Sequence, residues 1–223
     1  MQKSSTKTLY SYWNELRGSR SAPDRRDIDP TRIRGALTNT FILERNEQGE
    51  FDFRLAGSHL CAAYSRELKG RSFTGLWHQR DRDAMDTLVR AVTEDHAAAL
   101  VTFNGTTAIN TKVQVETVLL PVRHNGTTTT RLLGAMTAID EPYWFGMQPI
   151  TEQRITGLRL IWPDDVALED DVAINHAYPV PRDVVYTHGH AMSASGPAPM
   201  MATVFGRTAR RYAHLAVIDG GRI

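Results

Sequence analysis

The sequence contains very little cysteine, no excess charge of either sign and no long apolar run. Its 223 residues include one cysteine, Cys61, which excludes an intramolecular disulfide, and no cysteine and histidine cluster has zinc-site spacing. The 26 Lys and Arg balance 25 Asp and Glu, so the formal net charge of +1 gives no general attraction to nucleic acid or acidic lipid. No run of about 18 apolar residues and no apolar signal segment occurs. We therefore expect a cytoplasmic protein that does not bind membranes.

Motifs of the common enzyme classes are missing as well. The chain has no G-x-S-x-G nucleophile motif, no phosphate-binding P-loop, no dinucleotide-binding G-x-G-x-x-G and no H-E-x-x-H metal motif. Hydrophobic residues at 41% and charged residues at 23% are ordinary for a globular protein, so a packed core is expected. The sequence thus predicts a folded protein that is not an enzyme.

Residues 1–37 are expected to form helices that flank the main domain. Near the start, four apolar side chains recur at the spacing i, i+3, i+4, i+7, which places them on one face of a helix. These residues are Leu9, Tyr12, Trp13 and Leu16. Asp29 and Pro30 supply the N-cap and first position of a second short helix. Because the apolar face of the first helix needs a cover, we expect either a homodimer through this face or packing on the chain's own sheet.

Residues 38–141 carry the pattern of an α+β domain with one antiparallel sheet. Alternating apolar residues predict five strands, with hairpin turns at Asn46–Gly49 and Asn125–Gly126. The strands are expected around Phe41–Leu43, Phe51–Leu55, Ala98–Thr107, Lys112–Val122 and Arg131–Ile139. Short helices follow the second strand from Ser58, and a longer helix is expected over Asp81–Glu94.

The pattern weakens after this domain. We expect residues 142–162 to form an extension, in which Ile155–Trp162 is a short strand or helix. Residues 163–208 contain an acidic stretch and a segment of small residues with Gly, Pro and Ser, which is typical of a disordered linker. Apolar residues return in 209–223, which predicts a short docking tail. Its candidate contact residues are Leu215, Val217 and Ile218.

Several strings, taken together, resemble a PAS domain, and in particular the single-domain PAS regulatory proteins of alphaproteobacteria. The resemblance covers residues 8–141. The strings that carry it are Asp29-Pro30 before Ile33, Leu55 to Cys61, Arg66 to Leu68, Gly70, Phe73 with Leu76-Trp77, Glu116 with Leu119 to Pro121, and Arg131 to Gly134. The closing stretch, Leu215 to Arg222, also resembles tails of this group.

The resemblance implies a fold and a mode of action. A PAS fold has a five-stranded antiparallel sheet with short helices across one face, and it serves in sensing and interaction. By resemblance, the protein acts in signal transduction through protein–protein interaction, with a partner such as a histidine kinase or another regulator. A small-ligand or cofactor sensor is the alternative. A DNA-associated regulator is a weaker one, because acidic residues dilute the N-terminal arginines.

The resemblance also directs attention to an internal pocket. The side chains that face in the right direction to line it are Phe53, Leu60, Cys61, Tyr64 and Val89. Light-sensing PAS relatives carry a flavin-reactive cysteine in an Asn-Cys-Arg string, whereas here Cys61 lies between Leu60 and Ala62. Flavin is therefore disfavoured, and the cysteine is expected to be a small apolar core residue.

Histidines give no better case for a cofactor. His59 and His78 are expected to be solvated, and His96 would face the core only if the preceding helix continued past its acidic end. His188 and His190 lack a third ligand of the right spacing for a metal. We therefore expect no haem, no metal and no other cofactor, and any small ligand stays unidentified.

Overall fold

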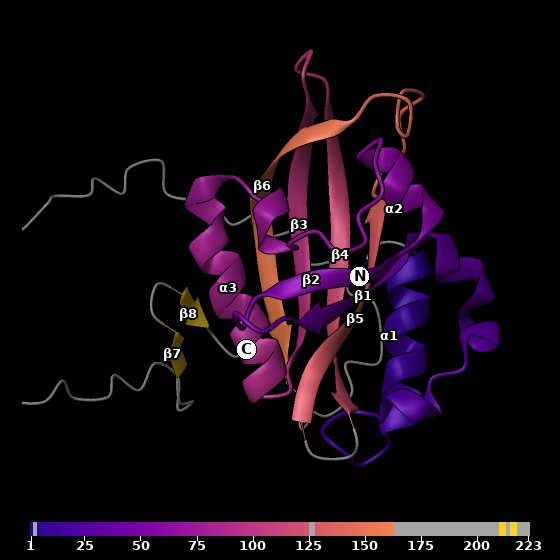
Figure 1. The fold of residues 1–223 in the computed structure, drawn as a ribbon, viewed down its shortest axis with the longest axis vertical. Coiled ribbons are helices and arrows are strands. Elements are labelled where there is room, and N and C mark those ends of the chain that lie inside the picture. Colours follow the sequence, from indigo (N-terminus) through magenta and orange to yellow (C-terminus); the bar gives the residue numbers. More distant parts are fainter. Residues whose placement is uncertain (2–3, 125–127, 163–209, 213–214, 218–223) are drawn as a thin grey trace, which may run out of the picture. The chain divides into compact units, whose positions relative to one another are not determined.

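The computed structural model describes residues 1, 4–124, 128–162, 210–212 and 215–217. The chain divides into two compact units, 1–168 and 169–223. Figure 1 shows the elements of the first unit. In chain order they are α1 (Ser4–Arg17), the 3-10 helices η1 (Arg25–Asp27) and η2 (Pro30–Asn39), β1 (Thr40–Arg45), β2 (Phe51–Ala56), α2 (Ser58–Ala63), η3 (Thr74–Leu76), α3 (Gln79–Glu94), β3 (Ala98–Thr107), β4 (Lys112–His124), β5 (Thr128–Ala138) and β6 (Ile150–Ile161).

Six strands form one antiparallel sheet in the order β2-β1-β5-β4-β3-β6. The α+β class and the single antiparallel sheet are therefore confirmed. The expected number of five strands is wrong, because β6 pairs with β3 over Ile150–Ile161. The sequence left Ile155–Trp162 undecided between a short strand and a helix. The pairing with β3 makes this segment a strand.

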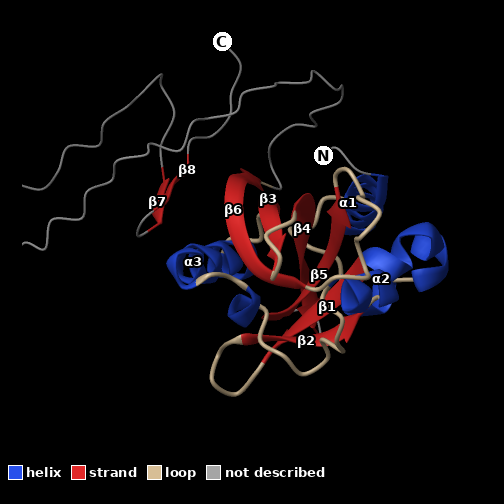
Figure 2. Cartoon of the chain, turned by 90° about the horizontal axis from the view of Figure 1, so that it is seen from above, coloured by secondary structure: helices blue, strands red, loops and turns tan. Residues whose placement is uncertain are grey.

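The sheet is covered on both faces, and Figure 2 shows α1 and α3 on opposite sides of it. On one face α2, η3 and α3 enclose the larger core, to which Val115 and Leu119 of β4 belong. On the opposite face, here called the outer face, α1 and η2 enclose a second core with Val118 and Leu120 of the same strand. Because successive strand residues point to opposite faces, β4 serves both cores.

α3 begins close to the predicted position and ends at the predicted one. His78 is its N-cap, and the ring Nδ1 accepts the N–H of Arg80 at 3.3 Å. Its apolar side chains face the larger core, as the helical spacing indicates. The helix stops at Glu94, and His96 adopts a positive φ of 57°. The apolar stripe therefore does not continue to this histidine.

Some predictions concern segments outside the described residues. They are the linker over 163–208, the tail residue Ile218 and the histidines His188 and His190. Of the second unit, the described residues are β7 (Arg210–Tyr212) and β8 (Leu215–Val217), which pair antiparallel and include two of the tail candidates.

No helix within the described ranges is both long enough and apolar enough to cross a membrane.

Candidate functional site

Aromatic side chains fill the larger core, where a pocket was expected. Phe41, Phe53 and Phe73 lie with ring centroids 5.6–5.9 Å apart. Trp77 continues the cluster, with its ring centroid 6.1 Å from that of Phe73 and 5.0 Å from that of Phe103. Most of these pairs are edge-to-face, which the charge distribution of aromatic rings favours. All five side chains are at most 1% exposed, so the cluster occupies the interior.

The predicted pocket residues lie in or beside this core. The buried ones are Phe53, Leu60, Tyr64 and Val89. Burial raises the pKa of Tyr64, whose hydroxyl donates to the sulfur of Met136 at 3.4 Å. Cys61 is half-buried at the margin of the core, with its Sγ 3.6 Å from Oε1 of Glu67. The structure thus brings these residues together, but as packing partners rather than as the wall of an open space.

A small cavity lies beside α2. Its volume is about 10 Å³, at the lower limit of what one water molecule needs. The lining includes Asn39, His59, Leu60, Met136 and Phe145. Leu60 is thus the one predicted pocket residue that lines it.

α1 is fixed on the outer face by apolar and polar contacts. Leu9, Tyr12 and Trp13 are at most 5% exposed and belong to the second core, with Leu16 packed at its margin. The indole Nε1 of Trp13 donates a 2.8 Å hydrogen bond to the backbone oxygen of Pro121 on β4. Of the two alternatives for this helix face, the structure places it on the chain's own sheet. The homodimer stays a prediction.

A buried carboxylate lies under the first turn of α1. Glu116 on β4 is 1% exposed, and the hydroxyl of Thr6 donates to its Oε1. The same end of the helix is tied to η2, because Nδ2 of Asn39 donates to Oγ of Ser5 at 3.2 Å. Burying a carboxylate is costly unless it is hydrogen-bonded, so the docking of α1 and the burial of Glu116 support each other.

Sequence reasoning did not select Glu116 as a site residue. The signal was present, because Glu116 is two residues before Val118 in an alternating strand and must share its face. The alternation alone does not show that a helix covers this face, and so the burial of the carboxylate could not be inferred.

The N-terminal arginines are partly paired within the chain. Arg32 lies 3.0 Å from Glu15, whose carboxylate raises the pKa of the guanidinium by accepting its hydrogen bond. Arg20 lies 2.8 Å from Asp27. Exposed ion pairs contribute little to stability, but they reduce the positive potential that a nucleic acid would meet.

The three histidines considered as haem ligands belong to different places in the fold. His59 is exposed on α2, and His78 caps α3. Nδ1 of His96 lies 3.2 Å from Oγ1 of Thr129 on β5. In the part of the chain that the structure describes, no three or more His, Cys, Asp or Glu side chains are grouped so that they could hold a metal ion.

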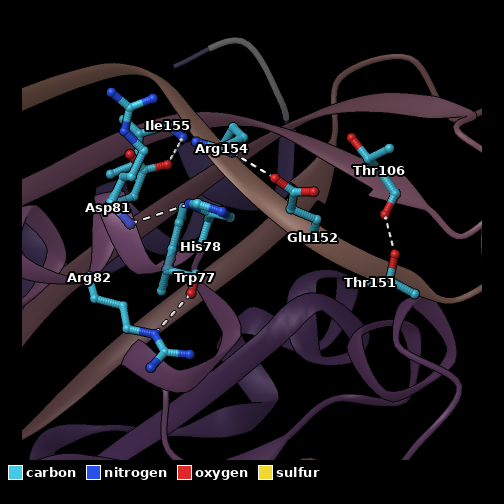
Figure 3. A network of polar contacts seen from close by, with 10 residues as sticks. Trp77, His78, Asp81, Arg82, Thr106, Thr151, Glu152, Arg154 and Ile155 are labelled. Atoms are coloured by element: carbon cyan, nitrogen blue, oxygen red, sulfur yellow. Dashed lines mark hydrogen bonds and ion pairs between the residues drawn. The ribbon is translucent and has the colours of Figure 1, made fainter.

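Polar contacts join the start of α3 to the edge of β6 (Figure 3). The N–H of His78 donates to the backbone oxygen of Gln153 at 3.3 Å, and Nε2 of Gln153 donates to the backbone oxygen of Leu76 at 3.1 Å. In the first turn of α3, Oδ2 of Asp81 accepts the N–H of Ile155 at 3.0 Å. These three hydrogen bonds, made by Leu76 of η3, by His78 as the N-cap of α3 and by Asp81 in its first turn, are called the α3–β6 contact below. The sequence could not predict it, because β6 itself was undecided.

Two buried polar atoms beside this contact have no hydrogen-bond partner among the residues that the structure describes. They are Nε1 of Trp77 and Oε1 of Gln153, and both residues are 1% exposed. An unpaired buried donor or acceptor costs about 1–3 kcal/mol. The α3–β6 contact is therefore incompletely satisfied.

The chain is similar to several solved structures at low sequence identity. The PAS domain of a protein from Colwellia psychrerythraea is 14% identical, with a TM-score of 0.37, and the match covers 49% of this chain and 97% of that one. The Rhodobacter sphaeroides LOV protein is 12% identical, with a TM-score of 0.39, over 52% of this chain and 71% of that one. The light state of the blue-light photoreceptor Aureochrome1 LOV is 16% identical, with a TM-score of 0.39, over 50% and 88%.

The family assignment rests on a different comparison. No curated protein matches the chain. A family model described as PAS domain matches residues 1–137, which run from α1 to the end region of β5. This match covers more than half of the chain and agrees with the antiparallel sheet and short helices described above. The chain belongs to the PAS domain family.

Proposed function

We propose that the protein is a non-catalytic cytoplasmic signalling protein that acts through protein–protein contact, as a single PAS domain of the alphaproteobacterial regulatory type. Its partner is a histidine kinase or another regulator. The observation that supports this proposal is the contrast between the two faces of the sheet. Aromatic side chains occupy the larger core, whereas α1 and η2 cover the outer face, with α1 over the buried Glu116.

The proposed mechanism is an exchange of α1 between a docked and a released state. Release exposes Val118, Leu120 and Leu133, which are at most 2% exposed when α1 is docked. It also exposes the carboxylate of Glu116 at the margin of this apolar surface, beside Thr102 and Thr137 on the neighbouring strands. A partner helix with an apolar stripe and one Lys or Arg fits such a surface. A partner that binds only the released state shifts the population toward it.

The same surface accommodates the homodimer, since α1 of a second copy carries the matching apolar face. Residues 209–223 are proposed as a second partner contact, connected to the PAS domain through the linker over 163–208. Both assignments come from the sequence and extend the main proposal.

A ligand sensor is the second candidate function. The observation that favours it is the cavity beside Leu60, whose lining includes the polar side chains of Asn39 and His59. A ligand larger than water requires the aromatic cluster to rearrange. Interiors are close-packed, so this rearrangement costs stability that the ligand must restore.

The exchange of α1 is tested with a synthetic peptide of residues 4–17, labelled with a fluorophore, and the full-length chain. Trp13→Ala weakens docking because it removes the largest buried side chain of α1 and its bond to Pro121. The matched control is Ser11→Ala, which changes an exposed residue of the same helix. We expect the W13A chain to bind the peptide at least about tenfold more tightly than the S11A chain, because its own helix competes less.

Equal affinity of the two variants for the peptide contradicts the exchange of α1. Cooperative unfolding of W13A confirms that the sheet is intact. Where W13A is unfolded, Trp13→Phe keeps the apolar ring, removes the Nε1 donor and is compared in the same way.

A further inference from the structure

β6 lies between α3 and the point at which the chain leaves the sheet. One edge of β6 pairs with β3 along its whole length. On the other edge, its first half is attached to the start of α3 through the backbone of Gln153 and Ile155. For Thr156–Ile161 the described residues provide no partner on that edge. The strand is thus attached to α3 at its start and leads out of the sheet at its end.

α3 is also part of the larger core. Its side chains Met85, Leu88, Val89 and Val92 are at most 4% exposed and belong to the core that contains the aromatic cluster. Because interiors are close-packed, a change in this core displaces the helix rather than being absorbed by empty space. At the start of α3, the attachment to the edge of the sheet is the α3–β6 contact.

An irregularity in β6 follows directly after this attachment. The partners of Phe103 and Thr102 on β3 are Ile155 and Gly157, so Thr156 is an extra residue in the pairing. Such a bulge bends a strand and increases its local twist. Since Ile155 is the last residue bonded to α3, a displacement there alters the direction of the second half of β6.

Two polar atoms with unused hydrogen-bonding capacity lie beside the contact. Nε1 of Trp77 is a donor and Oε1 of Gln153 is an acceptor, and both are buried without a partner. Buried polar groups are nearly always paired in native proteins. A buried water can pair with both kinds of atom, a donor and an acceptor.

We propose that the α3–β6 contact is a coupling device. It makes the start of α3 and β6 move as one unit, and it carries a change in the larger core to Ile161, where the chain leaves the sheet. The inference rests on the proposed function and deepens it, because it assigns the route by which the state of the PAS core reaches the residues after β6.

Hydrogen exchange of the full-length chain tests the coupling from the helix side. Asp81→Ala removes the acceptor for the N–H of Ile155. The matched control is Asp83→Ala, which removes the same charge from an exposed position of the same helix. We expect the amides of Ile155 and of Leu158–Ile161 to exchange about tenfold faster in D81A than in D83A. The proposal is overturned if only the amide of Ile155 exchanges faster in D81A than in D83A, or if no amide of β6 does.

The reverse direction is tested from the strand side. Gln153→Leu removes the donor to Leu76 together with the unpaired Oε1, and Arg159→Ala changes an exposed residue of the same strand. Coupling is reciprocal, so the amides of His78 and Asp81 are expected to exchange about tenfold faster in Q153L than in R159A. Unchanged exchange there contradicts the coupling.

These readouts need neither ligand nor partner. A chain that shows the coupling but does not bind the α1 peptide retains the inference and loses the proposed function. A chain that binds the α1 peptide but does not show the coupling retains the proposed function and loses the inference. In Asp81→Asn, which keeps an acceptor oxygen, the β6 amides are expected to exchange at rates between those of wild type and D81A. This variant replaces D81A where D81A is unfolded.

Discussion

Glu116 links the environment of one side chain to the position of a helix. In the docked state its carboxylate is buried and accepts a hydrogen bond from Thr6 of α1. In a released state the same carboxylate is exposed at the margin of an apolar surface. Its interaction with water or with a cationic partner then replaces the contact with α1.

We expect Glu116→Ala to lower the free energy of unfolding by about 1–3 kcal/mol, because it leaves buried hydrogen-bonding groups of α1 without their acceptor. The matched control is Gln114→Ala, which changes an exposed residue on the same face of β4. Urea denaturation of both variants measures the difference. A change in E116A no larger than that in Q114A contradicts the role given to the carboxylate.

Glu44 gives the fold an acid-sensitive component. Nε of Arg131 donates to Glu44 at 2.9 Å, and this hydrogen bond lowers the pKa of Glu44 below its ordinary value of 4.5. Because the folded pKa is the lower one, the stabilisation is present above pH 4.5 and is lost as the pH falls through the folded pKa. Solvent screening at this partly exposed pair limits it to less than about 1 kcal/mol.

Glu44→Gln is therefore expected to reduce the decline in the free energy of unfolding that wild type shows as the pH falls below 4.5. Glu47→Gln, at an exposed position in the neighbouring turn, is the control and keeps the wild-type decline. Denaturation curves between neutral and acidic pH provide the comparison. An unchanged pH dependence in E44Q contradicts a contribution of the Glu44–Arg131 pair to acid sensitivity.

At the scale of elements, β1 and β5 approach closely through a glycine. Phe41 on β1 is the register partner of Gly134 on β5, and a Cβ at Gly134 overlaps the ring of Phe41. This ring is fully buried in the aromatic cluster, so it has little room to move. A side chain on this strand position is incompatible with the packing of the core.

We expect Gly134→Ala to destabilise the protein by about 1–3 kcal/mol or more through overpacking. Gly35→Ala is the control, since nothing lies within 4 Å of a Cβ at this position of η2. Thermal or urea unfolding distinguishes them. Equal midpoints for the two variants mean that the aromatic cluster is less tightly packed than described.

The elements differ in how far the sequence determines them. Alternating residues such as Val113, Val115 and Leu119 predict β4 because strand alternation is a local property. β6 was undecided, because its strand character comes from pairing with β3 rather than from its own pattern. For α1 the sequence predicts the apolar face but leaves its cover open. An apolar helix face such as the one around Trp13 can pack equally well on the chain's own sheet or on a second copy of the chain.

At the scale of the whole molecule, the two cores have different consequences for function. Four of the predicted pocket residues lie in the larger core and Cys61 lies at its margin, but the sequence does not show that Phe41, Phe73 and Phe103 pack among them. Whether side chains leave a cavity depends on their summed volumes and rotamers in three dimensions. Information is therefore expected to pass through the surface that α1 covers and through the α3–β6 contact.

Native mass spectrometry of the full-length chain, purified from its own host, distinguishes action through a protein partner from action through a ligand. We expect the 25.0 kDa chain in complex with a signalling protein and without an added small mass. A small added mass that is retained under native conditions and lost on denaturation, on a chain without a protein partner, contradicts this expectation. Such a result makes ligand binding in the larger core the primary event.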